Sequence, residues 1–430
     1  MKKILSIMLA LTMVLGVVLL ASCGGNEDVK KGESDPLLPA PKIEKFTVSD
    51  DFKIGIICLH DENSTYDNNF LKAINSVKEA LGLRDDQVIV KVNINETNAC
   101  YDAAVDCVNK GCKVVFADSF GHESFMIQAA KDYPNVQFCH ATGTSAATVN
   151  LPNFHNAFAS VYQVRYLAGI AAGMKLNEMI KDGKITEDEA IIGYVGAFTY
   201  AEVVSGMTSF FLGARSVCPS ATMKVRYTGS WYDQTAEQEA ANALITTDKC
   251  VLISQHADSL GAPATCEEKG VPNVSYNGST YSAGENTFLI SSAINWAPYF
   301  AYIIKSVQDG TAIATNWTGN IETGSVVLSG VNLDVIAEGT EKAINDAIAK
   351  FKAGTLHVFD TKTFSVTGNL NAVVDEQGHL ISYMADVDGD YVPDTNVVHD
   401  GYFDESGADF RSAPYFDIII DGVTNINVKY

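Results

Sequence analysis

The feature that most constrains the fold is a regular alternation of short apolar runs with segments of helical periodicity. The first series contains apolar runs at 53–59, 87–94, 112–120 and 136–141, and helical patterns at 68–83, 99–111 and 123–134. Short apolar runs separated by helices of 10–17 residues are typical of βαβ units built around a parallel sheet. We therefore predict an α/β fold with parallel strands.

The same alternation returns in the second half of the chain. Its apolar runs are at 191–198, 223–231, 250–256 and 272–278, and its helical patterns are at 201–217, 235–249 and 261–270. The two series join near Phe154–Arg165, which predicts two similar lobes with a ligand cleft between them. We expect an N-terminal lobe of 46–158 plus 292–322, and a C-terminal lobe of 159–291 plus 323–430 that ends in a hairpin-rich tail from about residue 353.

The first residues have the pattern of a secretory signal. Met1-Lys2-Lys3 is followed by an apolar run that ends in "LASC" at Cys23. This order is typical of a signal peptide, expected over 1–22, and "LASC" resembles the bacterial lipobox. A membrane-spanning helix is disfavoured, because the apolar run is at the short end of the ~17–25 residues required.

Cleavage before Cys23 would leave this cysteine as a lipid attachment site. Two or three acyl chains hold a protein stably on a membrane surface. Residues 23–45 are then expected to form a lipidated, flexible tether, because they contain few large apolar side chains. The predicted location is the extracytoplasmic face of the cell membrane.

The charge balance excludes a nucleic-acid partner. The sequence contains 30 basic and 52 acidic residues, a net charge of −22. Removing Lys2 and Lys3 with the signal leaves 28 against 52, or −24. Such a surface repels nucleic acid and anionic lipid.

No common catalytic or cofactor motif is present. The sequence has no GxxxxGK[ST], HExxH or GxSxG motif and no GxGxxG after a strand. We therefore expect no cofactor and no enzymatic activity.

Eight cysteines remain after Cys23, and none has the spacing of a zinc site. They are Cys58, Cys100, Cys107, Cys112, Cys139, Cys218, Cys250 and Cys266. Several lie in apolar runs, where a free cysteine behaves as a small buried hydrophobe. An exported compartment also permits disulfides, for instance among Cys100, Cys107 and Cys112, and the sequence leaves both alternatives open.

One acidic cluster, "DVDGDYVPD", is a calcium candidate. Its carboxylates are Asp386, Asp388, Asp390 and Asp394. Oxygen ligands on a tight glycine turn suit calcium, but the spacing departs from that of an EF-hand and no bidentate glutamate follows. The alternative, which we favour, is a solvated hairpin turn in which Gly389 supplies a positive φ.

Polar and aromatic side chains gather just after the predicted strands, where ligands bind in parallel sheets. The residues predicted to bind a ligand are Tyr66, Asp67, Asn69, Phe70, Phe120, His122, Tyr200, Trp231, His256, Asp258, Asn277, Asn295 and Trp296. Arg and Lys are absent from this set, which argues against a phosphate or carboxylate ligand. Aromatic faces with amides and carboxylates suit a flat, neutral, polar ring or a sugar. The alternative is that Phe70, Trp231 and Trp296 are packing residues.

Five stretches carry a resemblance to a known family. The lipobox, "KIGIICLHDENSTYDNNF", "YLAGIAAGMK", "IIGYVGAF" and "SSAINW" resemble the basic membrane protein family of substrate-binding lipoproteins of ABC importers. The resemblance extends from the lipobox to about residue 350. It implies a type I periplasmic-binding fold, an ABC permease as partner and a monomeric binding protein. Characterised members resemble purine nucleoside receptors, in which aromatic residues enclose the base and charged residues hold the ribose.

The resemblance transfers to this chain at some positions and not at others. The family motif "DKSF" falls on 67–70, so Asp67 and Phe70 match it. The family aspartate after a later strand falls on Asn277, and the family lysine falls on Asn295. Because both charged groups associated with ribose are replaced by amides, the sequence favours a purine nucleobase or a similar heterocycle without a diol.

Two other functions stay open at this point. The same fold serves ligand-sensing lipoproteins that act in signalling. An exported nucleoside hydrolase is a further alternative, for which the Asp-rich cluster would have to hold a catalytic metal.

Overall fold

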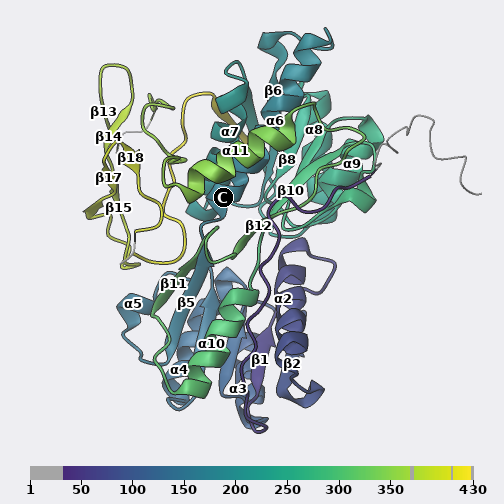
Figure 1. Cartoon of the computed structure of the whole chain (residues 1–430). Coiled ribbons are helices and arrows are strands. Elements are labelled where there is room, and N and C mark those ends of the chain that lie inside the picture. Colours follow the sequence, from purple (N-terminus) through teal and green to yellow (C-terminus); the bar gives the residue numbers. More distant parts are fainter. Residues whose placement is uncertain (1–31, 369–371, 408–409, 428–430) are drawn as a thin grey trace, which may run out of the picture.

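The computed structural model describes residues 32–368, 372–407 and 410–427. The predicted signal peptide and Cys23 lie outside the described residues. Figure 1 shows two α/β lobes, one above the other, with a group of short hairpins along one side. The predicted fold class, two parallel-sheet lobes, is confirmed.

The N-terminal lobe is built on a sheet of six parallel strands in the order β11-β5-β4-β3-β1-β2. The strands are β1 (Ile54–Ile57), β2 (Val88–Lys91), β3 (Val114–Ala117), β4 (Gln137–Ala141), β5 (Phe154–Ala159) and β11 (Asn316–Gly319). The sequence predicts β1 to β4, whereas β5 falls in the segment interpreted as the join between the lobes. β5 is buried throughout, so its pattern lacks the polar alternation of a half-exposed strand.

The C-terminal lobe has seven strands in the order β12-β10-β9-β8-β6-β7-β19. They are β6 (Ile191–Gly196), β7 (Thr222–Tyr227), β8 (Leu252–Gln255), β9 (Asn273–Tyr276), β10 (Phe288–Ile294), β12 (Val326–Leu328) and β19 (Val423–Asn427). Only β12 runs antiparallel to its neighbour in this sheet. The strand β19 comes from the end of the chain and pairs in parallel with β7.

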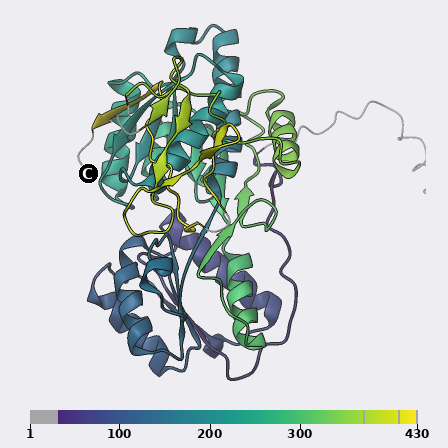
Figure 2. The same ribbon diagram turned by 90° about the vertical axis from the view of Figure 1, so that its left-hand side faces the viewer.

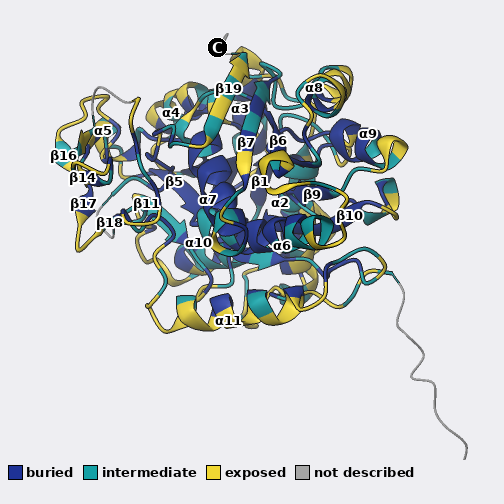
Figure 3. Cartoon of the chain, turned by 90° about the horizontal axis from the view of Figure 1, so that it is seen from above, coloured by how far each residue is buried: buried dark blue, intermediate teal, exposed yellow. Residues whose placement is uncertain are grey.

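Helices cover both faces of each sheet. In the N-terminal lobe they are α2 (Thr65–Leu81), α3 (Asn98–Asn109), α4 (Glu123–Asp132), the short α5 (Ala146–Val149) and α10 (Ala297–Asp309). In the C-terminal lobe they are α6 (Val161–Lys181), α7 (Ala201–Val217), α8 (Gln234–Thr246), α9 (Gly261–Lys269) and α11 (Thr340–Lys352). Figure 3 shows that α6 and α7 are largely buried, whereas α11 exposes one face. None of these described helices combines the length and apolar character needed to cross a membrane.

Besides the link from the N-terminal segment on β12 to β1, the chain passes between the lobes at 159–161, 294–297 and 319–326. Three neighbouring crossings are typical of a hinge that allows the lobes to open and close. The strand ends that face the cleft therefore come from two bodies whose separation can change.

The segment predicted as a flexible tether is ordered in its described part. Leu38 is buried and exchanges backbone hydrogen bonds with Leu328 of β12, and Glu33 forms a β-bridge with Asn332. The expectation of a free tether over 23–45 is therefore wrong for 32–38, because β12 offers an unpaired edge to which the segment adds.

The tail contacts both lobes, as Figure 2 shows. It contains β13 (Val373–Val374), β14 (Leu380–Ser382), β15 (Met384–Ala385), β16 (Thr395–Asn396), β17 (Val398–His399) and β18 (Tyr402–Phe403), which pair as antiparallel hairpins. Gly389 has φ +84° and lies so close to the carbonyl of Thr144 in the N-terminal lobe that a Cβ would stand 1.8 Å from that oxygen. The predicted hairpins are present, and the tail also spans the two lobes.

Two glycines allow α6 and α7 to pack backbone to backbone. A Cβ on Gly169 of α6 would lie 2.0 Å from the carbonyl oxygen of Phe210, and a Cβ on Gly213 of α7 would lie 2.0 Å from that of Tyr166. No side chain larger than hydrogen fits at such a separation. Helix α7 also contains Gly206, where an added Cβ would lie no closer than 3.6 Å to any neighbouring atom.

This contrast predicts opposite outcomes for two substitutions in α7. Gly213→Ala should lower the free energy of unfolding by about 1–3 kcal/mol, the usual cost of overpacking. Gly206→Ala should leave it unchanged or raise it by up to about 1 kcal/mol, because alanine is the better helix former. Urea unfolding of both variants measures the difference. Equal effects at the two positions would contradict the backbone contact.

Candidate functional site

A cavity lies between the two lobes at the carboxyl ends of their strands. Its twelve described lining residues are Leu59, His60, Tyr66, Asp67, Ser119, Phe120, Thr142, Glu202, Trp231, His256, Asp258 and Asn277. Its empty volume is ≈ 360 Å³. We call this cavity between the closed lobes the slot.

The structure brings together seven of the thirteen residues predicted to bind a ligand. Tyr66, Asp67, Phe120, Trp231, His256, Asp258 and Asn277 line the cavity, whereas Asn69, Phe70, His122, Tyr200, Asn295 and Trp296 are not among its lining residues. The remaining lining residues were not in that set. Among them, His60 and Ser119 lie three and two residues beyond the ends of β1 and β3, a signal that the sequence did contain.

Asp67 is an ionised, buried carboxylate in the first turn of α2. Its oxygens accept hydrogen bonds from the backbone N–H of His60 (2.7 Å) and from the hydroxyl of Ser64 (2.6 Å), and Nδ1 of His60 lies 3.3 Å away. Burial raises the pKa of Asp67, but these hydrogen bonds outweigh burial and the net shift is downward. Its position at a helix N-terminus also favours the negative charge.

Asp118 faces Asp67 and has the opposite protonation. It follows β3, is fully buried, and accepts a hydrogen bond from the N–H of Leu59 (3.1 Å). Burial raises the pKa of Asp118 well above its usual range, and the charge of Asp67 raises it further. The two pKa shifts together favour the ionised form of Asp67 and the neutral form of Asp118.

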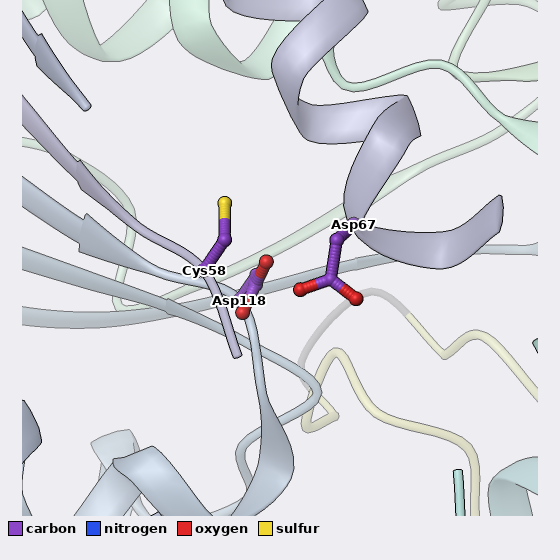
Figure 4. Close-up of side chains that lie close together, drawn as sticks. All are labelled: Cys58, Asp67 and Asp118. Carbon is purple, nitrogen blue, oxygen red and sulfur yellow. The ribbon is translucent and has the colours of Figure 1, made fainter. Parts of the chain in front are cut away.

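Figure 4 shows Cys58 beside these two carboxyl groups. The possible ligand atoms of Cys58, Asp67 and Asp118 lie within 4.8 Å of one another, a separation compatible with a metal ion. Burial raises the pKa of the Cys58 thiol and of the Asp118 carboxyl and so favours the neutral form of both groups. Asp67 is hydrogen-bonded through both oxygens, whereas Oδ2 of Asp118 is buried without a hydrogen-bond partner.

Asp258 and Asn277 form the facing wall in the C-terminal lobe. Nδ2 of Asn277 donates to Oδ1 of Asp258 (2.9 Å), and burial raises the pKa of Asp258 well above its usual range. Asn277 has φ +62°, a left-handed conformation that asparagine tolerates better than most residues. This turn directs its amide toward the cavity.

Direct hydrogen bonds join the two lobes beside the cavity. The backbone N–H and the hydroxyl of Thr65 each donate to the carbonyl of Asp258 (both 3.0 Å). Nδ2 of Asn69 donates to Oδ1 of Asn277 (3.2 Å). Asn69 therefore holds the lobes together in this closed arrangement, although it does not line the cavity.

Aromatic rings from both lobes border the cavity. Phe120 of the N-terminal lobe stacks on Tyr200 of the C-terminal lobe, with ring centroids 5.3 Å apart and planes at 29°. Trp231 packs edge-to-face on Phe198 at 4.8 Å. Phe120 and Tyr200 are partly exposed, whereas Trp231 is among the residues that line the cavity.

Phe70 and Trp296 belong to the core of the N-terminal lobe. Their rings stack at 4.5 Å and 22°, and Phe116 packs against both. Both side chains are at most 1% exposed. For these two residues the structure favours the packing alternative, because α2 and α10 meet at this point.

His122 and Asn295 support the site from behind. Nε2 of His122 lies 2.8 Å from the carbonyl of Ile94, and burial lowers the pKa of His122 to about 4. Nδ2 of Asn295 donates to the carbonyl of Gly324 (2.9 Å), and its oxygen accepts the N–H of Ala297 at the start of α10 (3.2 Å). The Asn295 amide is therefore used within the hinge.

A buried arginine lies behind His256. Arg165 of α6 has no exposed surface, stacks on Tyr276 at 4.6 Å and donates to the carbonyl of Gln255 (3.1 Å). Burial lowers the pKa of His256, the nearby Glu202 raises it, and Arg165 lowers it again, with a downward result. His256 is therefore neutral and offers one donor and one acceptor nitrogen.

The Asp-rich cluster lies in the tail, away from the cavity. Oxygens of Asp386, Asp388 and Asp390 lie within 4.8 Å of one another, and Asp394 is not part of this group. Asp386 is already paired with Arg411 (2.9 Å) and accepts the N–H of Gly389 (2.8 Å). The structure is that of a hairpin turn held by its own backbone.

Two parallel-sheet lobes that close on a polar and aromatic slot define the class of bilobed solute-binding proteins. A solved ABC transporter solute-binding protein from Conexibacter woesei has the same fold, with a TM-score of 0.57 at 19% identity over 71% of this chain and 98% of that chain. The model of the Bmp family, described as ABC transporter substrate-binding protein PnrA-like, matches residues 62–362, and the chain belongs to this family. It is thus an extracytoplasmic, substrate-binding component of an ABC transporter.

Two curated relatives differ in the ligand that their names state. The "Putative ABC transporter glucose-binding protein TsgA13" of Haloferax volcanii is 36% identical over 242 residues, which are 55% of this chain and only 58% of that protein. The "Purine-binding protein BAB2_0673" of Brucella abortus is 30% identical over 311 residues, 71% of this chain and 83% of that protein. The tail beyond residue 362 lies outside the family match.

The protonation of Asp118 leads to a prediction about stability. A carboxyl group whose pKa is raised by folding binds more protons in the native than in the unfolded state. Its contribution to the free energy of unfolding therefore falls as the pH rises above 3.8, the ordinary pKa of an aspartate. Asp118→Asn should reduce this loss by up to about 1.4 kcal/mol per pH unit. Urea unfolding between about pH 5 and pH 8 measures the slope.

The control is Asp51→Asn, because Asp51 is exposed in a turn of the same lobe. It should keep the wild-type slope, to which the buried Asp258 and Glu405 contribute in the same direction. A slope for Asp118→Asn equal to that of the control would refute the assigned protonation.

Proposed function

We propose that the ligand is a flat, uncharged, nitrogen-rich ring of the purine nucleobase class. The observation that carries this proposal is the chemistry of the slot: its twelve described lining residues include aromatic faces and hydrogen-bonding groups but neither Arg nor Lys. An anionic ligand would face Asp67 without a cation to balance it. A flat neutral ring fits between Trp231 and the opposite wall without that cost.

The edge of a purine alternates hydrogen-bond donors and acceptors, and the polar residues that line the slot also offer both kinds of group. The protonated Asp258 supplies a donor, the amide of Asn277 supplies both kinds of group, and the neutral His256 supplies one of each. The ionised Asp67 accepts only. These four residues could therefore form hydrogen bonds with the amino, imino and ring-nitrogen groups on the edge of such a ring.

A nucleobase is favoured over a nucleoside. The charged groups associated with ribose in the family fall on Asn277 and Asn295, and the amide of Asn295 is occupied within the hinge. A ribose would also need room in a slot whose open space is small. The relative named as purine-binding supports the purine class without deciding between base and nucleoside.

A monosaccharide is the second candidate ligand. The relative named as glucose-binding has the higher identity, although over a shorter part of the chain. Tryptophan faces with carboxylates and amides also suit a sugar ring, whose apolar face stacks and whose hydroxyls form hydrogen bonds. The two candidates differ in the test below.

Binding would act by closing the lobes. A ligand that contacts both walls stabilises the closed state, in which Thr65 meets Asp258 and Asn69 meets Asn277. The closed monomer would then deliver its ligand to the ABC permease. We further propose that diacylation of Cys23 anchors the protein to the extracytoplasmic face of the membrane, where two acyl chains give stable attachment.

Thermal-shift measurements on the exported chain test the ligand class. A ligand at about 100 times its Kd adds about 2.7 kcal/mol to the stability of the native state, which corresponds to several degrees in Tm. The panel contains adenine, guanine and hypoxanthine, their nucleosides, and glucose. We expect the bases to raise Tm and the nucleosides and glucose to have no effect.

Each other outcome is informative. If a nucleoside raises Tm more than its base, Asn277 accommodates a ribose and the preference for a base is wrong. If only glucose raises Tm, the sugar candidate replaces the purine class. If no member of the panel acts, the proposed ligand class is wrong.

Trp231→Leu should weaken binding of the active base by at least about fivefold, since stacking of a base on an aromatic side chain contributes about 1–3 kcal/mol. Trp317→Leu is the matched control, because Trp317 is also partly buried but packs on Tyr299 and Tyr302 within the N-terminal lobe. Isothermal titration measures Kd for both. An unchanged Kd for Trp231→Leu would exclude stacking on this residue.

A further inference from the structure

Cys107 and Cys112 lie together at the end of α3. The helix ends in a Schellman motif: the N–H of Cys112 donates to the carbonyl of Cys107 (3.1 Å), and the N–H of Gly111 donates to that of Val108 (2.9 Å). Gly111 has φ +90°, the left-handed conformation that this motif requires. In a Schellman motif the side chains at these two outer positions frequently contact each other, so this backbone brings the two cysteines to the same side of the helix end.

A second observation comes from β1, beneath the helix. A Cβ on Gly55 would lie 2.6 Å from Sγ of Cys107 and 3.6 Å from Sγ of Cys112. Both sulfur atoms therefore lie over the same glycine, and the absence of a side chain at Gly55 leaves room for both. The two thiols also form a hydrogen bond with each other.

The end of a second helix, α9, has the same motif with a single cysteine. At the end of α9, Val271 donates to the carbonyl of Cys266 (3.0 Å) and Gly270 to that of Glu267 (3.3 Å). Cys266 occupies the same position of the same motif as Cys107, but its partner is a valine. A cysteine can therefore serve here as an apolar contact, and only α3 has a second sulfur atom opposite the first.

We propose that Cys107 and Cys112 form a disulfide bond in the exported protein. The family is extracytoplasmic, and such compartments form and keep disulfides. Both side chains are at most 2% exposed, so the bond forms during folding and is afterwards shielded from reductants. It joins Cys107 near the end of α3 to Cys112, two positions before β3, the strand that Asp118 directly follows.

The chemistry is a thiol–disulfide exchange with an oxidant disulfide, either a small molecule or an oxidoreductase. The hydrogen bond from Cys112 lowers the pKa of Cys107, and the nearby Lys91 lowers it further against the effect of burial. The Cys107 thiolate attacks the oxidant, forms a mixed disulfide and releases one thiolate. Cys112 then loses its proton and attacks the Cys107 sulfur, releasing the second oxidant thiol. Two electrons and two protons pass to the oxidant.

The sequence offers a direct test, because Lys110 lies between the two cysteines. Trypsin cuts after Lys91, Lys110 and Lys113, and places Cys107 in peptide 92–110 and Cys112 in peptide 111–113. The full chain, exported and purified without reductant, is denatured with N-ethylmaleimide and digested. We expect the two peptides to remain linked, two hydrogens lighter than their sum, and to separate after reduction.

Substitutions identify the sulfur atoms. Cys100 is also in peptide 92–110, but its Sγ is directed to the carbonyl of His122 at 4.0 Å, so Cys100→Ser should keep the linked pair. Cys107→Ser and Cys112→Ser should both lose it. Wild-type protein with maleimide on both Cys107 and Cys112, or a link that Cys100→Ser abolishes, would overturn the proposal. The wild-type digest decides the first point even if a variant fails to fold.

Discussion

The site depends on the burial of three aspartates in a chain of net charge −22, with no basic side chain among the cavity's described lining residues. Three ionised carboxylates in so small a space would repel each other, and desolvation would add to the cost. Hydrogen-bond donors around Asp67 lower its pKa and favour its ionised form. Burial raises the pKa of Asp118 and of Asp258 and favours their neutral forms. The resulting wall presents both acceptors and donors, which is the property that a neutral heterocycle requires.

The contacts that close the lobes beside the cavity include the hydrogen bonds of Thr65 and Asn69, the Phe120–Tyr200 stack and the contact of His60 with Tyr232. A closed state held by such contacts leaves the balance between open and closed forms to the ligand. Other contacts lie away from the cavity. The backbones of α6 and α7 pack tightly at their glycines within the C-terminal lobe, and the tail packs on both lobes. The tail is also the part that lies beyond the family match, so this chain adds a bridge at the edge of a common fold.

Part of the site followed from one rule, that ligands bind beyond the carboxyl ends of parallel strands. The rule pointed to Asn277, which directly follows β9, and to Asp258, three residues beyond β8, and both line the cavity. It also pointed to Phe70 and Trp296, which pack in the core, because aromatic residues near a strand end also fill the space between α2 and α10 and periodicity does not distinguish these surroundings. Thr142 carried no signal, because its place in the cavity follows from a backbone with φ +67° that a β-branched residue rarely adopts.

The sequence by itself determined the two-lobed α/β fold, the family and the absence of cations near the strand ends, since all of these are local patterns of periodicity and composition. Only the tertiary structure decided which strand-end residues face each other, which of the aspartates carry protons, and that Asn295 is used within the hinge. It also decided that Cys107 and Cys112 share a space over Gly55, and that residues 32–38 pair with an edge strand. These properties depend on distances between segments far apart in the chain and on burial, which no local pattern contains.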